Sequence, residues 1–104
     1  MWPFTVFRIE DKSMEPYLKS GDYVIVNKIA YAFKNPVKND VVVLKHRNRF
    51  LVKRVGKILE DRYFVKGDNV KSSKDSRHFG PVDKKSIVGK VLFISARPVS
   101  PTSR

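Results

Sequence analysis

The stretch "VVVLKHRNRFLVKRVGKIL", residues 41–59, decides the fold class of this chain. Two runs rich in Val, Leu, Ile and Phe flank a short polar break, and neither run has the apolar spacing of a helix. β-branched and aromatic side chains favour extended structure, because they pack well on a pleated surface. The stretch therefore predicts two β-strands, over residues 40–45 and 49–59.

Four further runs have the same composition and are bounded by Gly, Pro, Asn or Asp, which end strands. They are residues 4–9, 23–28, 62–67 and 86–94. Six strands in 104 residues predict a mostly β fold, with a single small antiparallel domain of coiled, barrel-like sheets. We assign residues 1–95 to this domain and residues 96–104 to a flexible tail, because the tail is rich in Pro and Ser.

The segments between the expected strands differ in the turns and loops that they predict. "KILEDRYFV", residues 57–65, predicts a hairpin with Glu60 and Asp61 at its turn. Residues 13–19 and 28–33 each have room for one helical turn. Residues 66–86 are the longest strand-poor segment, and a loop of that length in a small domain is often functional.

The composition limits the classes of function. A formal charge of +12 suits nucleic acid, an anionic membrane surface or an acidic protein partner, although the basic residues are scattered along the chain. The absence of cysteine excludes disulfides and thiolate metal sites, and two isolated histidines make a weak metal site, so we expect no metal and no cofactor. No apolar run approaches the length of a membrane helix, so we expect a soluble, cytoplasmic protein.

The turn "DKSMEPYLKSGD", residues 11–22, precedes the strand "YVIVNK". By itself it is an ordinary turn, since Gly, Pro, Ser and Asp are common turn residues. It gains meaning from two later segments, "FLVKRV" around Lys53 and "GDNVKSSKDSRHFG" at residues 67–80. In this order and spacing, the three segments resemble the signal peptidase I clan of S26-type serine-lysine proteases, from about residue 5 to residue 95.

The chemistry of such a protease explains the residue types. A serine hydroxyl is a poor nucleophile until a neighbouring base accepts its proton, and a lysine can do so only when its amine is neutral. That requires its pKa to fall from about 10.4 toward neutrality, which burial among apolar groups can cause. Lys53 has apolar neighbours in the sequence on both sides. The alternative for Lys53 is a solvated strand lysine whose stem lies along the sheet.

The resemblance implies roles for residues of this chain. Ser13 is the expected nucleophile, Lys53 the expected general base, and Ser73 the serine that orients the lysine amine. The supporting residues, mainly structural, are Met14, Pro16, Arg54, Asp68, Asn69, Asp75 and Arg77. One departure from the family is Asp11, which stands where many members have a hydroxyl that helps to stabilise the oxyanion.

Within the clan, the chain looks closest to the short soluble branch that matures nickel-type superoxide dismutase. That resemblance implies removal of an N-terminal pro- or signal peptide from a precursor protein, with no nucleic acid required. A second interpretation is a membrane-associated signal peptidase I-like enzyme, whose peripheral membrane contact would involve Trp2 and Phe4. A third, of a different class, is a basic β-barrel that binds nucleic acid by aromatic stacking. The oligomeric state stays open.

Overall fold

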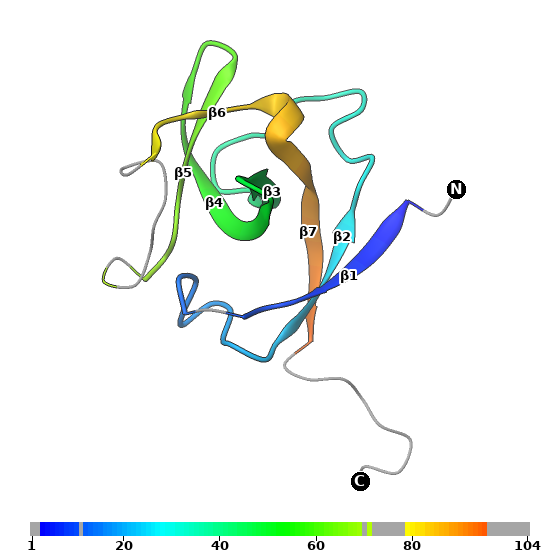
Figure 1. Ribbon diagram of the computed structural model, residues 1–104. Coiled ribbons are helices and arrows are strands. Elements are labelled where there is room, and N and C mark those ends of the chain that lie inside the picture. The colour runs from blue at the N-terminus through cyan, green and yellow to red at the C-terminus, as the bar shows by residue number, and fades with distance from the viewer. Residues whose placement is uncertain (1–2, 11, 70, 72–78, 96–104) are drawn as a thin grey trace, which may run out of the picture.

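A computed structural model (Figure 1) describes residues 3–10, 12–69, 71 and 79–95 of the chain. Its elements are β1 (Phe4–Arg8), β2 (Tyr23–Asn27), β3 (Val41–His46), β4 (Arg49–Leu59), β5 (Arg62–Lys66), β6 (Val82–Asp83), the 3-10 helix η2 (Lys84–Ser86) and β7 (Ile87–Ser95). The mostly β prediction is confirmed, and each of the six expected strands is present to within one residue at either end. The short elements β6 and η2 were not expected; both lie inside the expected loop 66–86. The proposed tail, residues 96–104, is outside the described residues.

The strands form one antiparallel sheet with the order β1-β2-β7-β3-β4-β5-β6. Among the described strands, β1 and β6 do not pair with each other, so they form the two edges of an open sheet. The sheet coils about β3, which Figure 1 shows nearly end-on with β4, β6 and β7 around it. Coiling of this kind is how a single sheet can bury apolar side chains on both of its faces.

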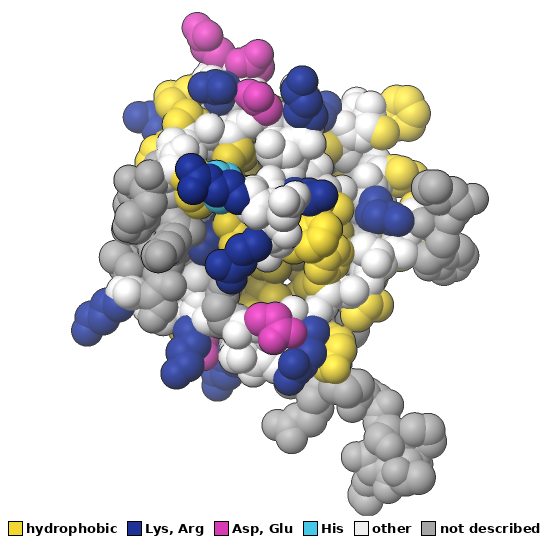
Figure 2. All heavy atoms as spheres, in the orientation of Figure 1, with side chains coloured by type: hydrophobic (Ala, Val, Ile, Leu, Met, Phe, Trp, Pro, Cys, Tyr) yellow, Lys and Arg dark blue, Asp and Glu magenta, His cyan; other side chains and the backbone are white. Residues whose placement is uncertain are grey.

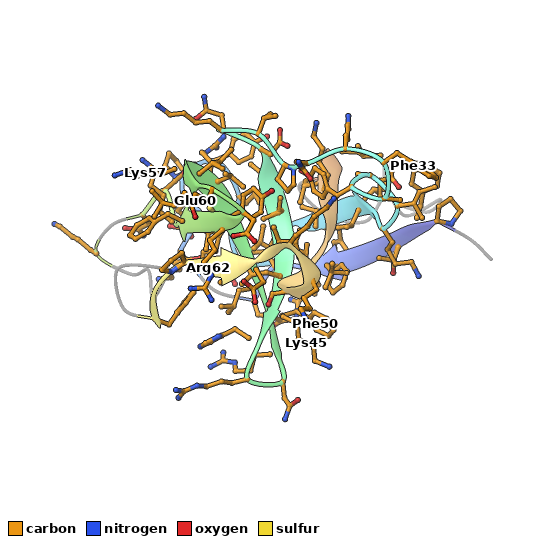
Figure 3. The ribbon with its side chains drawn as sticks, turned by 90° about the horizontal axis from the view of Figure 1, so that it is seen from above. Phe33, Lys45, Phe50, Lys57, Glu60 and Arg62 are labelled. Atoms are coloured by element: carbon orange, nitrogen blue, oxygen red, sulfur yellow. The ribbon has the colours of Figure 1, made fainter. Side chains whose placement is uncertain are left out.

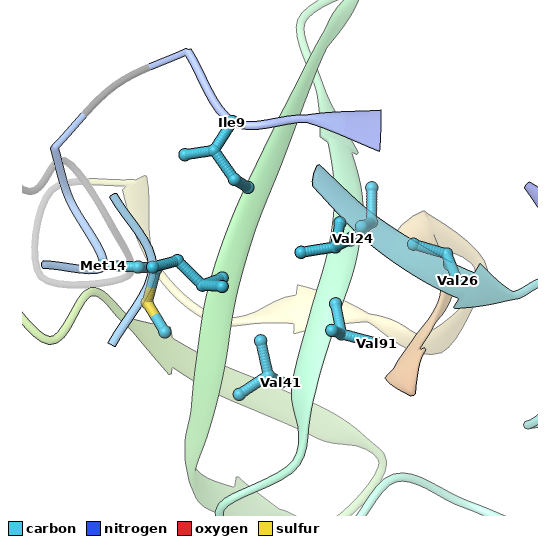
Figure 4. Close-up of a cluster of buried hydrophobic side chains, with 8 residues drawn as sticks. Ile9, Met14, Val24, Val26, Val41 and Val91 are labelled. Carbon is cyan, nitrogen blue, oxygen red and sulfur yellow. The ribbon is translucent and has the colours of Figure 1, made fainter. Parts of the chain in front are cut away.

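The central strand β3 is buried on both faces, which accounts for its unbroken apolar sequence. Val41 and Val43 belong to one core cluster, shown in part in Figure 4, together with Met14 from the turn after β1. Val42 and Leu44 belong to a second cluster on the other face. Successive strand residues point to opposite faces, so one strand joins the two clusters.

The β4–β5 hairpin confirms the turn predicted at residues 60–61. Leu59 pairs with Arg62, and Glu60 has a positive φ of 59°, as a tight two-residue turn requires. The two possible helical turns are single turns only. Leu18 N–H donates to the Met14 carbonyl at 2.9 Å, and Ala32 N–H to the Ile29 carbonyl at 3.1 Å.

Gly89 allows β7 to approach the backbone of β2 closely. A Cβ at this position would collide with the Asn27 carbonyl oxygen and would also lie within 2.8 Å of a Val26 methyl group. The same region carries a register shift in β2, between Ile25 and Val26. The absence of a side chain at Gly89 is therefore a packing requirement, because backbone atoms cannot move aside as a flexible side chain can.

Candidate active site

The turn that carries Ser13 is fixed to the end of β1 by its own hydrogen bonds. Ile9 N–H donates to the Asp22 carbonyl and Gly21 N–H to the Ile9 carbonyl, both at 2.8 Å. The Asp22 carboxylate accepts from Lys19 N–H at 2.8 Å. Gly21 has a φ of +96°, which glycine adopts without strain. Gly21 and Asp22 thus close the turn into β2.

Ser13 itself is buried, with 3% of its surface exposed. Its neighbour Met14 and the nearby Leu18 are also buried and pack into the first core cluster, which anchors the turn from beneath. Pro16 follows a cis peptide bond with Glu15 in this turn. The structural roles that the resemblance implied for Met14 and Pro16 are compatible with these positions.

Lys53 is buried more completely than any other charged residue that the structure describes, with 2% of its surface exposed. It lies in β4 opposite Val42 of β3. Its neighbours at two-residue spacing, Leu51 and Val55, pack in the second core cluster, whereas Val52 packs against the first. A solvated lysine lying along the sheet is therefore excluded.

Asp68 and Asn69 connect the turn of Ser13 to the strand of Lys53. Asn69 N–H donates to the Ser13 carbonyl at 2.8 Å, and the Asn69 side-chain amide donates to the Lys12 carbonyl at 3.0 Å. Asp68 accepts two hydrogen bonds from Arg54, the residue that follows Lys53. Two adjacent residues of the "GDN" segment thus hold both the nucleophile candidate and the base candidate.

The Arg54–Asp68 pair has the bidentate geometry that makes arginine–carboxylate contacts strong. Both of its hydrogen bonds are 2.9 Å long, and both side chains are largely shielded from solvent. The hydrogen bonds that Arg54 donates to Asp68 raise the pKa of Arg54, outweighing the opposing effect of burial. Arg54 also donates to the Asn39 carbonyl at 3.2 Å and lies over the Tyr17 ring at 4.8 Å.

Replacing Asp68 by alanine is expected to lower the free energy of unfolding by about 1–3 kcal/mol, because Arg54 loses a charge-assisted, bidentate partner. Asp83→Ala is the matched control, since Asp83 pairs with Arg62 in a half-exposed ion pair at 3.1 Å. Its loss should cost at most about 1 kcal/mol. Urea unfolding of both variants measures the difference, and equal costs would show that Arg54–Asp68 does not brace the site.

A groove of about 380 Å³ lies beside this turn. Its lining residues are Phe7, Arg8, Ile9, Glu10, Met14, Arg49, Phe50 and Val52. Phe7 and Phe50 meet edge to face, with their ring centroids 5.2 Å apart. Figure 2 shows this face hollowed near its centre, with hydrophobic side chains in the hollow and both basic and acidic groups around it. The groove joins the open edge of β1 to β4 and reaches Met14, the neighbour of Ser13.

Three expected site residues, Ser73, Asp75 and Arg77, lie outside the described residues, as does Asp11. Their predicted roles stay predictions. Among the residues that are described, no group of three or more His, Asp or Glu side chains could hold a metal ion. No helix in the same part of the chain has the length and apolar character needed to cross a membrane.

Sequence reasoning did not find the residues that line the groove, nor the contact between Tyr17 and Arg54. It also missed a buried network in which the Tyr31 hydroxyl donates to Asp40 at 2.7 Å. Burial, followed by the hydrogen bond to Asp40, raises the pKa of Tyr31, so this phenol stays neutral. Each of these contacts joins residues from different segments, and nothing in their local sequences marks the pairing.

Comparison of the sequence with known proteins identifies the family of this chain. The sequence profile described as signal peptidase, peptidase S26, matches residues 1–57 and 56–96, which is nearly the whole chain. The chain belongs to the signal peptidase family, peptidase S26. The two matched parts meet within β4, after Lys53, so the turn of Ser13 and Lys53 fall in the first part and Asp68 and Asn69 in the second.

Several bacterial signal peptidases resemble the chain over most of their length. Signal peptidase I of Bacillus caldolyticus is 30% identical, with 89% of this chain and 80% of the relative aligned. Signal peptidase IB of Staphylococcus aureus (strain N315) is 30% identical over 86% of the chain and 76% of the relative. Signal peptidase I V of Bacillus subtilis (strain 168) is 27% identical, with 83% and 82% aligned. These alignments span 138 to 146 positions, more than the 104 residues here, so the relatives contain segments that this peptidase lacks.

Proposed function

We propose that this member of the peptidase S26 family is a serine endopeptidase in which Ser13 is the nucleophile and Lys53 the general base. One observation carries the proposal. Tyrosines aside, Ser13 and Lys53 are the two polar or charged side chains that are buried among the described residues. Moving polar groups from water into the core opposes folding. Buried polar groups are therefore often found where the protein needs them for binding or catalysis.

The burial of Lys53 suits the role of base. An ammonium group among apolar side chains is poorly solvated, which favours the neutral amine. In the proposed reaction, this amine takes the proton of the Ser13 hydroxyl while the serine oxygen attacks the carbonyl carbon of the scissile bond. The lysine then gives the proton to the departing amine, and an acyl-enzyme remains. Water then gives a proton to the same lysine and attacks the acyl carbon. The serine oxygen leaves and takes the proton from the lysine, which releases the new carboxyl end of the peptide and restores the serine.

The groove supports an extended polypeptide as the substrate. Within the described part of the chain, β1 pairs with β2 alone, so its outer edge is the place where a further strand would add to the sheet. The groove residues Phe7 to Glu10 run along β1 and just beyond it, and Met14 and Val52 supply an apolar floor. An added strand obtains affinity from main-chain hydrogen bonds and selectivity from pockets for alternate side chains.

The proposed substrate is a precursor protein with an N-terminal pro- or signal peptide. The signal peptidase relatives support this class. The resemblance to the nickel-type superoxide dismutase maturation branch favours a nickel superoxide dismutase precursor within the class.

Incubation of the purified protein with two precursors tests the proposal. One is a nickel superoxide dismutase precursor, the other a secreted protein with its signal peptide, and mass spectrometry locates any cut. A single cut between leader and mature protein is expected in at least one of them. If a folded preparation cuts neither precursor, with or without detergent, and instead binds nucleic acid tightly, the peptidase assignment is wrong and the nucleic-acid alternative replaces it.

A further inference from the structure

The segment from Lys28 to Lys38 exposes apolar side chains between lysines. Phe33 is 98% exposed, Ile29 55% and Val37 58%. Lys28, Lys34 and Lys38 are exposed beside them, and residues 28–38 contain no Asp or Glu. Single exposed apolar residues are common on protein surfaces, but three of them among three cations in eleven residues form a distinct surface.

This segment is held in place rather than frayed. Tyr31 and Pro36 are buried on either side of Phe33. Asp40 accepts hydrogen bonds from the Tyr31 hydroxyl at 2.7 Å and from Val37 N–H at 3.1 Å. At the start of the segment, Lys28 N–H donates to the Pro3 carbonyl at 2.7 Å. Because the residues on both sides are anchored, the Phe33 side chain is directed into solvent by the fold itself.

The 3-10 helix η2 extends the basic character of this surface. Lys84 donates to the Asn35 side chain at 3.0 Å, which ties η2 to the segment. Lys28, Lys84 and Lys85 line a hollow of about 670 Å³ whose apolar lining includes Ile29 and Val88. Asp61 and Asp83 also line the hollow, and Asp83 is paired with Arg62. Three lysines against two carboxylates leave the hollow with a basic excess, and exposed lysines flank the protruding apolar side chains.

We propose that the surface formed by residues 28–38 and Lys84–Lys85 docks on an anionic lipid bilayer, with Phe33 and Ile29 entering its interface. The chemistry of the surface favours this partner. Apolar side chains that project beyond a ring of lysines match a boundary at which acyl chains lie beneath negatively charged headgroups. Nucleic acid offers no apolar layer for Ile29 and Val37, and its usual partners are aromatic platforms and arginines.

The docking surface lies away from the candidate active site. Lys28 follows the end of β2 that pairs with Phe4, whereas the turn of Ser13 follows the opposite end of the same β1–β2 pair, where Arg8 meets Tyr23. Figure 3 likewise places Phe33 at one extremity of the molecule, apart from Phe50 of the groove. A bilayer bound to this surface would leave the groove open to a polypeptide approaching from the aqueous side. The proposal does not depend on the peptidase mechanism.

Vesicle co-sedimentation of the full chain tests the proposal. The probes are vesicles of phosphatidylcholine alone and of phosphatidylcholine with phosphatidylserine. Binding is expected to the second kind only and to weaken as salt is added, because screening reduces attraction between the lysines and the headgroups. Phe33→Ser should reduce the partition coefficient about tenfold, since the ring no longer leaves water. Lys34→Glu should reduce it several-fold.

Matched controls separate this surface from the general basicity of the protein. Phe50→Ser removes another exposed phenylalanine, and Lys57→Glu reverses another exposed cation; Figure 3 labels both residues away from Phe33. Neither control should change vesicle binding more than about twofold. Equal losses in test and control variants, or equal binding to neutral vesicles, would overturn the proposal. Binding of single-stranded DNA that is lost in Phe33→Ser, with no vesicle binding in the wild type, would assign the surface to nucleic acid instead.

Discussion

Ser13→Ala is expected to lower kcat/KM for peptide cleavage by a factor of about 10³ or more while leaving the fold intact. Without the hydroxyl no acyl-enzyme can form, and what remains is the small acceleration from binding the peptide beside polar groups. The substitution removes one oxygen from a side chain that is 3% exposed and adds no bulk, so the surrounding Met14 and Leu18 should keep their packing. The measurement is the rate of cleavage of a peptide that spans the cut found in a precursor.

Ser20→Ala is the matched control for this variant. Ser20 lies in the same turn, but its hydroxyl faces solvent and its contact to the Glu10 carbonyl is long, at 3.4 Å. Its loss should change kcat/KM less than about twofold. If Ser13→Ala keeps most of the activity and unfolds at the same urea concentration as the wild type, then Ser13 is not the nucleophile.

The fold could be predicted from the sequence because its strands are locally encoded. Runs such as residues 49–59 and 62–66 contain their own β-favouring residues and their own turn residues, so their positions do not depend on distant contacts. The order of the strands could not be predicted. β7 lies between β2 and β3, a placement that comes from packing across the core and, at Gly89, from a close backbone approach that only the folded chain reveals.

The resemblance named the candidate site residues, including the supporting Arg54, Asp68 and Asn69, but not the partner of each. Ser13 and Lys53 could be named as candidates because the resemblance rests on short motifs around them. The burial of Lys53 could not be predicted, since a lysine between apolar strand residues can equally point to solvent. The Asn69 hydrogen bonds to the turn and the Arg54–Asp68 pair join segments far apart in the sequence. Distances between such segments are set by the whole sheet.

Lys53→Met is expected to abolish cleavage as completely as Ser13→Ala while leaving the protein folded. Methionine has a similar length and flexibility and fills the same space among Leu51, Val55 and Val42. The apolar replacement removes the cost of desolvating the amine, which offsets the loss of the interaction that the amine makes. A folded but inactive variant would show that the lysine is needed for catalysis rather than for folding.

The control is Lys57→Met, on the exposed part of the same strand, which should change neither activity nor stability appreciably. The Ser13→Ala/Lys53→Met double variant should be no slower than either single variant, because two residues that act as a unit lose their joint contribution once. In the wild type, cleavage should rise with pH between about pH 6 and 10 as the base loses its proton. A Lys53→Met protein that is folded and active would end the proposal of a lysine base. One that cannot fold would assign Lys53 to the core, and Lys53→Arg, charged but far more basic, would then decide whether the neutral amine matters for cleavage.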